Sequence, residues 1–205
     1  MNEPSKNFKM KMEKQKHKNN KNTAVAKEFT FSYTYPIGKY KAPEKLNEKA
    51  LKACIDDIRA LPELLQDAIK KVNKKKKLQY TYRDGGWTIE QIVHHLADSH
   101  ANAYIRFKLA LTENNPTIAP YDENLWAETA DVQMPIKVSY HLLKALHKKW
   151  VVLLENMDSN DWKRTYFHPA KKQEVALDEM ISLYAWHGKH HVAQIIAALK
   201  KHKEH

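Results

Sequence analysis

The chain has 205 residues, of which 42% are hydrophobic, with ten Tyr, five Trp and five Phe, and its formal net charge is +11. This length suits one domain with an additional segment, and the apolar and aromatic content is sufficient for a core. Because only four Gly occur, sandwiches and barrels with many tight turns are disfavoured, and we expect an all-α protein.

The N-terminal segment, residues 1–28, has eight Lys against three Glu and few large apolar residues. We predict a disordered basic tail, because such a composition buries too little apolar surface to fold. No apolar stretch of a secretory signal occurs in it, and no run of about eighteen apolar residues follows, so we expect a cytoplasmic protein without membrane contact. The remaining positive charge is scattered without a DNA-binding motif, which makes nucleic acid an unlikely partner.

Residues 29–205 are predicted to form one domain. Residues 29–43, which contain Pro36, Gly38 and Pro43, favour an extended lead-in. Apolar residues then recur at three-and-four spacing from residue 44 to about residue 73, which predicts a first helix that Pro62 kinks or interrupts. The single cysteine, Cys54, lies in this helix, so both a disulfide framework and a cysteine-based zinc site are excluded.

A second helix is predicted from Trp87-Thr88 to residue 113, after the turn signal at residues 84–86. Residues 114–134 lack a clear period. A connection of this length is unusual in a compact domain and suits a helical bundle that uses a crossover. Tyr121, Asp122 and Trp126 lie on it and are available to shape a pocket.

A third helix is predicted over residues 135–156, and a fourth begins at Leu177 with Asp178 and Glu179 in its first turn. Between them, RTYF and QEVA flank the turn-like HPAKK, which favours a short β-hairpin. The expected architecture is therefore a four-helix bundle with one long crossover and one short hairpin.

The fourth helix carries three histidines in the stretch YAWHGKHHVAQI, residues 184–195. His187 and His191 are four residues apart and project about 40 degrees from one another on a helix, so both can face one metal ion. Position 188 is Gly, so the glutamate that serves as general base in HExxH metalloproteases is absent. Another element must supply a third ligand.

The second helix offers His94, His95 and His100 for that ligand. We choose His95, because Gln91, Asp98 and Asn102 form a polar stripe on its face, whereas His94 points elsewhere. Asp98, Asn102 and Tyr184 are candidates to orient the metal ligands by hydrogen bonding, and Asp98 is the candidate catalytic residue.

Three neutral imidazoles with an open fourth position match the catalytic type of zinc site, and they also suit nickel or copper. A metal ion bound there lowers the pKa of a water or of an incoming thiol, either of which then becomes a nucleophile at neutral pH.

Simpler interpretations remain open. Histidines four residues apart are often only solvated or hydrogen-bonded, His190 could replace either neighbour as a ligand, and Asp98 could bond only to nearby groups. Trp87 and Trp186 are expected to be packing aromatics. His168, before a proline, is expected in a turn or at the mouth of the site, and His17, His202 and His205 are expected to be solvated.

Three stretches carry a resemblance to a known family: YPIGKYKAP, YRDGGWTIEQIVHHLADSH with the residues that follow it, and RTYFHPAKKQEVALDEMISLYAWHGKHHVAQI. They resemble the DinB-like proteins, closely the YfiT branch, over most of residues 35–195. The resemblance implies a four-helix bundle and a zinc or nickel ion, about one per chain, held by His95, His187 and His191. It also implies a homodimer.

The activity implied by the resemblance is that of a metal-dependent hydrolase that activates water. Related members look like S-transferases that join a low-molecular-weight thiol such as bacillithiol to an electrophile, so a thiol is a possible small-molecule substrate. A non-catalytic metal-binding or stress-related interaction module is a further alternative, as is a basic tail that binds nucleic acid in a salt-dependent manner.

Overall fold

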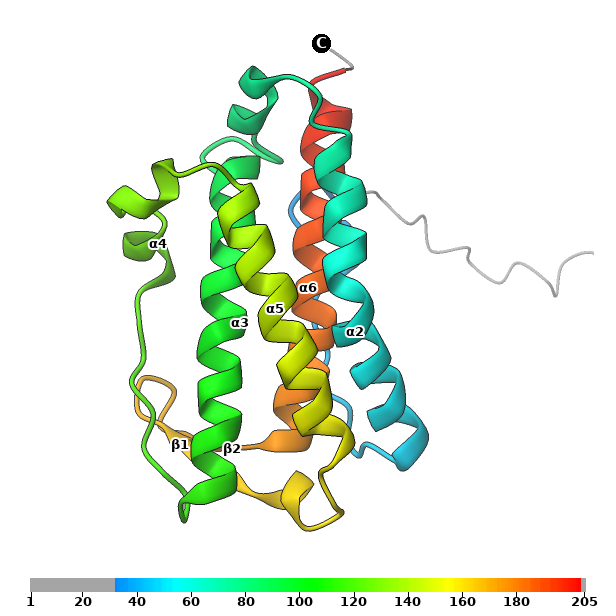
Figure 1. Cartoon of the computed structure of the whole chain (residues 1–205), viewed down its shortest axis with the longest axis vertical. Coiled ribbons are helices and arrows are strands. Elements are labelled where there is room, and N and C mark those ends of the chain that lie inside the picture. Colours follow the sequence, from blue (N-terminus) through cyan, green and yellow to red (C-terminus); the bar gives the residue numbers. More distant parts are fainter. Residues whose placement is uncertain (1–31, 204–205) are drawn as a thin grey trace, which may run out of the picture. The chain divides into compact units, whose positions relative to one another are not determined.

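The structure is a computed structural model that describes residues 32–203 (Figure 1). The predicted basic tail, residues 1–28, lies outside the described residues. Within the described part of the chain, no helix combines the length and the apolar composition needed to cross a bilayer. The following description concerns the described residues alone.

Four long helices form a bundle: α2 (Glu48–Lys70), α3 (Ile89–Thr112), α5 (Lys137–Glu155) and α6 (Leu177–Lys201). α2 packs against α5 and α6, and α3 also packs against α5 and α6. In Figure 1, α2 and α6 run in one direction while α3 and α5 run in the other. Because α3 and α5 are parallel, the segment between them must return along the bundle, as the predicted crossover requires.

The helix boundaries follow local capping. Thr88 caps α3 in a capping box, since its side chain accepts from the Gln91 N–H while the Gln91 side chain accepts from the Thr88 N–H. The Asn47 side chain caps α2, so this helix begins a few residues later than the periodicity predicts. α2 continues through Pro62, whose missing N–H removes one helical hydrogen bond.

The connections contain short elements. η1 (Lys75–Gln79) links α2 to α3, and η3 (Asp161–Lys163) precedes the hairpin of β1 (Thr165–His168) and β2 (Gln173–Ala176). The antiparallel register pairs Thr165 with Ala176, which confirms the predicted hairpin.

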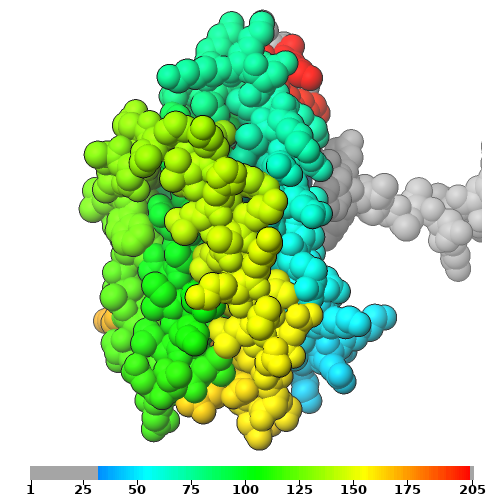
Figure 2. Space-filling view, in the orientation of Figure 1, coloured from blue at the N-terminus to red at the C-terminus, as the bar shows by residue number. Residues whose placement is uncertain are grey.

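The sequence suggested that the long connection is irregular throughout, but part of it is helical. It contains α4 (Glu123–Trp126) and η2 (Ala130–Gln133). α4 forms because the Asp122 side chain accepts from the Asn124 and Leu125 N–H groups, and one turn is too short to produce a hydrophobic period. Figure 2 shows this segment, in light green, covering one face of the bundle beside α5.

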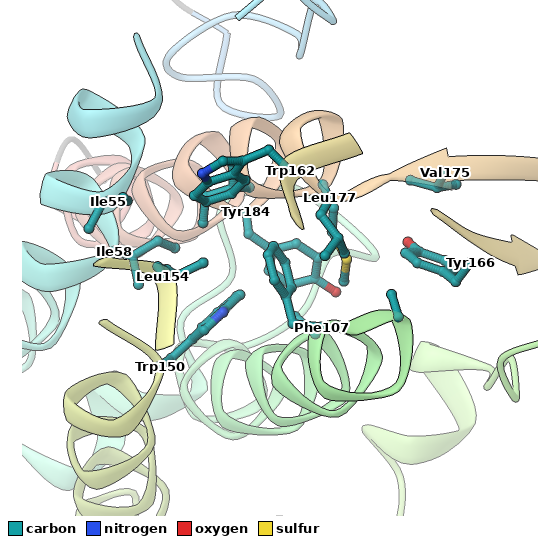
Figure 3. Packing of buried hydrophobic residues seen from close by; sticks show 14 of the residues in the cluster. Ile55, Ile58, Phe107, Trp150, Leu154, Trp162, Tyr166, Val175, Leu177 and Tyr184 are labelled. Atoms are coloured by element: carbon teal, nitrogen blue, oxygen red, sulfur yellow. The ribbon is translucent and has the colours of Figure 1, made fainter. Parts of the chain in front are cut away.

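The buried apolar side chains form two clusters along the bundle. The hairpin-end core joins all four helices to the hairpin, and Figure 3 shows how its side chains converge. Its members include Ile55, Ile58, Phe107, Trp150, Leu154, Trp162, Tyr166, Val175, Leu177 and Tyr184. The opposite-end core includes Leu61, Leu65, Ile89, Ile92, Leu96, Leu143, Ile195 and Ala198.

Histidines occupy the level where one core gives way to the other. This histidine layer consists of His95 and His100 on α3, His147 on α5, and His187 and His191 on α6. Four of these side chains are buried, while His187 is partly exposed to a cavity that it lines. The bundle therefore holds a polar layer between two apolar ones.

Candidate metal centre

Three histidines of this layer converge on one point. His95 comes from α3, and His187 and His191 come from successive turns of α6. One ring nitrogen of each lies within 4.8 Å of the others. The Nε2 atom of His187 is 3.2 Å from Nε2 of His95 and 3.1 Å from Nε2 of His191. The structure thus brings together the three residues that the sequence selects.

The spacing of these nitrogens fits a metal ion. Zinc–nitrogen bonds of about 2.0–2.1 Å in a tetrahedron place neighbouring nitrogens about 3.3 Å apart, close to the distances within the cluster. Lone pairs of neutral imidazoles repel at this distance unless a proton or a cation lies between them. The donor set also suits nickel or copper.

Burial keeps the three rings neutral. It lowers the pKa of His95 to about 4. Burial also lowers the pKa values of His187 and His191 well below the usual histidine range, and repulsion from neighbouring histidines adds to the effect. At neutral pH the rings are therefore unprotonated, which is the form that binds metals.

Gln194 fixes the tautomer of His191. Its side-chain nitrogen donates to the carbonyl of Thr34, so its side-chain oxygen faces Nδ1 of His191 at 2.9 Å. The Nδ1–H of His191 donates to that oxygen, which leaves the lone pair on Nε2 directed into the cluster.

A longer relay fixes the tautomer of His187. Nδ1 of His147 lies 2.6 Å from the carbonyl oxygen of Ile58, which can only accept, so His147 carries its proton on Nδ1. Pro62 has no N–H to donate to this carbonyl four residues earlier, which leaves the carbonyl available inside α2.

The rest of the relay follows from the neutrality of the rings. Burial lowers the pKa of His147 to about 4 and that of His100 well below its usual range. A neutral His147 accepts at Nε2 from the Nδ1–H of His100, 3.0 Å away. His100 in turn accepts at Nε2 from the Nδ1–H of His187 at 3.3 Å. The Nε2 lone pair of His187 is thereby free for a metal ion.

The residues predicted to orient the ligands lie elsewhere. Among residues 32–203, Asp98 makes no hydrogen bond to the three histidines, so no hydrogen bond in the structure supports its predicted catalytic role. The Asn102 side chain donates to the backbone carbonyl of Asp98. Tyr184 packs against His187, with ring centroids 5.4 Å apart, but its hydroxyl faces Ser99. Burial, and then repulsion from Asp131, raises the pKa of Asp98 to about 6.

Sequence reasoning missed the ligands' hydrogen-bond partners. Gln194 lies three residues after His191 on the same helical face, which is a signal that could have identified it. His100 ends the HHLADSH stretch of the second helix, but its sequence neighbours gave no reason to expect that it hydrogen-bonds a metal ligand. His147 is one of two histidines, with His141, in a basic helix, and no local pattern distinguishes it.

The alternative ligands take other positions. Both ring nitrogens of His94 face groups outside the cluster, at the Ser139 hydroxyl and the Met134 carbonyl. His190 stacks on Trp186 with ring centroids 4.4 Å apart, and its Nδ1 has no hydrogen-bond partner in the described part of the chain. Trp87 covers the cluster, with its ring 4.5 Å from that of His95.

The cluster opens into a cavity of about 290 Å³. The three histidines line this cavity together with Trp87 and Glu123, and no other carboxylate lines it within the described residues. A small molecule can therefore reach a fourth coordination position, as catalytic metal sites require and closed structural sites do not.

Known proteins similar to this chain share one family description. The sequence profile of the DinB superfamily matches residues 55–195. A relative from Oceanobacillus iheyensis, named "putative metal-dependent hydrolase", is 45% identical over 167 residues, which span 82% of this chain and 96% of that protein. A Bacillus cereus relative of the same name is 47% identical over 167 residues, covering 82% and 95% of the two chains.

A solved structure is also similar. YfiT from Bacillus subtilis, described as "a probable metal-dependent hydrolase with an unusual four-helix bundle topology", superposes with a TM-score of 0.80 at 41% sequence identity. The match covers 83% of this chain and 98% of that one.

Proposed function

This chain belongs to the DinB superfamily, and we propose that it is a metal-dependent hydrolase whose His95, His187 and His191 bind one zinc or nickel ion. The convergence of three Nε2 lone pairs in a solvent-accessible cavity carries this proposal. The names of its relatives and of YfiT support the reaction class.

A divalent ion held by His95, His187 and His191 would supply Lewis acidity for the hydrolysis. The protein supplies orientation. Gln194 and the His100–His147 relay hold the protons of two ligand rings on Nδ1, so that Nε2 stays free. Trp87 shields one side of His95 from solvent. We assign proton acceptance to Glu123, because it is the carboxylate in the cavity lining.

A metal measurement tests the site. Untagged, chelator-washed protein, with His17, His202 and His205 replaced in every sample, is expected to contain about one metal ion per chain by elemental mass spectrometry. His95→Ala, His187→Ala and His191→Ala should lose the ion, whereas His190→Ala should retain it because His190 stacks on Trp186 outside the cluster. Equal metal content in all four variants would contradict the proposal.

A second candidate is transfer of a low-molecular-weight thiol to an electrophile. The observation that favours it is the position of Cys54, which packs against the hairpin-end core while no described cysteine lines the cavity. A thiol substrate would therefore have to supply the sulfur. Turnover of thiol–electrophile pairs, compared with hydrolysis of ester and amide panels by the metal-loaded protein, separates the two reactions.

A further inference from the structure

A second cavity of about 330 Å³ adjoins the metal centre. His187 and Glu123 line both cavities, so the two spaces meet at a histidine of the cluster. Arg106 of α3, Tyr121 of the long connection and Tyr166 of the hairpin form part of its wall. Its size is at the lower end of the range for small-molecule sites.

Arg106 is buried in this wall without an ionic partner. Its side chain is 8% exposed, and its guanidinium makes one long hydrogen bond, 3.4 Å from Nη2 to the carbonyl of Ala119. Its guanidinium carbon lies 5.9 Å from the centre of the Tyr121 ring. Among residues 32–203 it forms no ion pair. A buried guanidinium has five N–H donors and is costly to leave uncompensated, so its donors call for an anion from outside the chain.

The other charged groups of the cavity determine what anion fits. Lys171 adds a second positive charge, and Glu123 is the carboxylate in the lining. His168 is neutral at neutral pH, because burial and then the charges of Arg106 and Lys171 lower its pKa. In the metal-free chain, the ionised groups of the lining therefore carry one more positive than negative charge, which a singly charged anion balances.

The phenols make the lining rich in donors. Burial raises the pKa of Tyr121 to about 12 and raises that of Tyr166 as well, so both hydroxyls keep their protons at neutral pH. Hydroxyl groups and a guanidinium together suit a ligand with acceptor oxygens, and the guanidinium fork matches a carboxylate in a bidentate manner. The aromatic rings provide apolar contact for the rest of the ligand.

We propose that this cavity binds the carboxylate of a small organic substrate, with Arg106 as its anchor. The substrate class that follows rests on the proposed function. If the protein is a hydrolase, its substrate is an ester or amide with a free carboxylate, whose reacting carbonyl lies toward His187.

Calorimetric titration of the full-length, metal-free protein tests the anchor. The probes are benzoate and benzamide, which differ in charge but hardly in shape. Benzoate should bind more tightly than benzamide to the unaltered chain and should lose at least about tenfold in affinity in Arg106→Gln. Arg59→Gln, which removes the same charge from the exposed face of α2, is the matched control and should bind benzoate normally.

Two further variants test the anchor even if Arg106→Gln does not fold. Arg106→Lys keeps the charge but loses the fork, and Lys171→Gln alters an exposed hairpin residue, so each should weaken benzoate binding by about threefold. Absence of benzoate binding, equal binding of the two probes, or unchanged affinity in both Arg106 variants would overturn the inference. If Arg106→Gln does not fold, unchanged affinity in Arg106→Lys and Lys171→Gln would overturn it.

The use of metal-free protein separates this inference from the proposed function. A chain that binds benzoate through Arg106 but shows no metal-dependent hydrolysis refutes the reaction and leaves the carboxylate site in place. A hydrolase that does not distinguish benzoate from benzamide refutes the carboxylate site alone.

Discussion

In the hairpin-end core, Phe107, Trp150 and Leu154 are almost fully buried among apolar side chains. One to two turns away, the same helices bury His100 and His147 just as completely. Apolar burial stabilises the fold by about 25 cal/mol per Å² removed from water, whereas a buried imidazole is costly unless its nitrogens are hydrogen-bonded.

The two regions meet these demands differently. The hairpin-end core relies on packing, and even the Trp150 indole N–H has no partner among the described residues. The histidine layer relies on directed hydrogen bonds, which run from the Ile58 carbonyl to His187. Stability and metal binding should therefore respond to changes in different layers, although both layers lie on the same helices.

Leu154→Ala is the largest expected change in stability. Leu154 is 1% exposed, and truncation of such a side chain costs about 2–5 kcal/mol in the free energy of unfolding. Urea denaturation of the metal-free protein measures the loss. Metal content at a temperature where the variant is folded should equal that of the unaltered chain. Loss of metal in this folded variant would contradict the separation of the layers.

His147→Leu tests the opposite layer. It removes the acceptor that holds the proton of His100 on Nδ1, so His100 and then His187 can change tautomer, and metal affinity should fall about 10-fold to 100-fold. Competition with a chromogenic chelator measures the affinity.

His147→Gln is the control for the relay. Its amide nitrogen can donate to the Ile58 carbonyl while its oxygen accepts from His100, so it should restore most of the affinity. If Leu and Gln at this position weaken metal binding equally while both variants fold, His147 has only a packing role.

Gly188→Ala affects the contact between α6 and α2 beside His187. A Cβ atom at Gly188 would lie 2.5 Å from Cδ2 of Leu61, a side chain that is 1% exposed. The gain in helix propensity is about 1 kcal/mol, and overpacking costs about 1–3 kcal/mol, so a net loss of up to about 2 kcal/mol is expected. Repeating the substitution in a Leu61→Ala background, which provides space, should make it stabilising. Equal losses in both backgrounds would exclude the clash with Leu61 as the cause.

The fold was largely predictable because the helices are long and their apolar residues recur with helical period. The crossover was predictable from its length, and the hairpin from its turn residues. α4 was not, since a single turn capped by Asp122 has no period to detect. The start of α2 was misplaced by a few residues because the Asn47 cap, not the apolar pattern, determines where the helix begins.

For the site, sequence spacing placed His187 and His191 on one face, and the polar stripe around His95, together with the resemblance, selected His95 over His94. The Ile58–His147–His100 relay could not be predicted, because it joins three helices and depends on a carbonyl that Pro62 leaves free. The Arg106 cavity likewise joins α3, the long connection and the hairpin. Contacts of this kind arise from packing between elements that are distant in the sequence, so local periodicity does not predict them.

Asp98→Asn should give the smallest effect, with a characteristic pH dependence. Burial, and then Asp131, raises the pKa of Asp98 to about 6 from an ordinary value of 3.8, so the folded state binds this proton more tightly than the unfolded state does. Ionisation therefore costs stability progressively as pH rises from about 4 to about 6, and the cost stays constant above that range. Asn cannot ionise.

Metal-free Asp98→Asn should thus match the unaltered chain in stability at pH 4 and exceed it by about 1 kcal/mol at pH 8, a value reduced for partial solvent access. Urea denaturation at pH 4, 6 and 8 measures the difference, and Asp56→Asn on the exposed face of α2 controls for loss of charge. An offset that does not change with pH would show that Asn alters packing and not ionisation. A gain that develops between pH 4 and pH 6 and stays constant up to pH 8 would show that the ionised Asp98 side chain is retained at a cost in stability, as the buried polar groups of the histidine layer are.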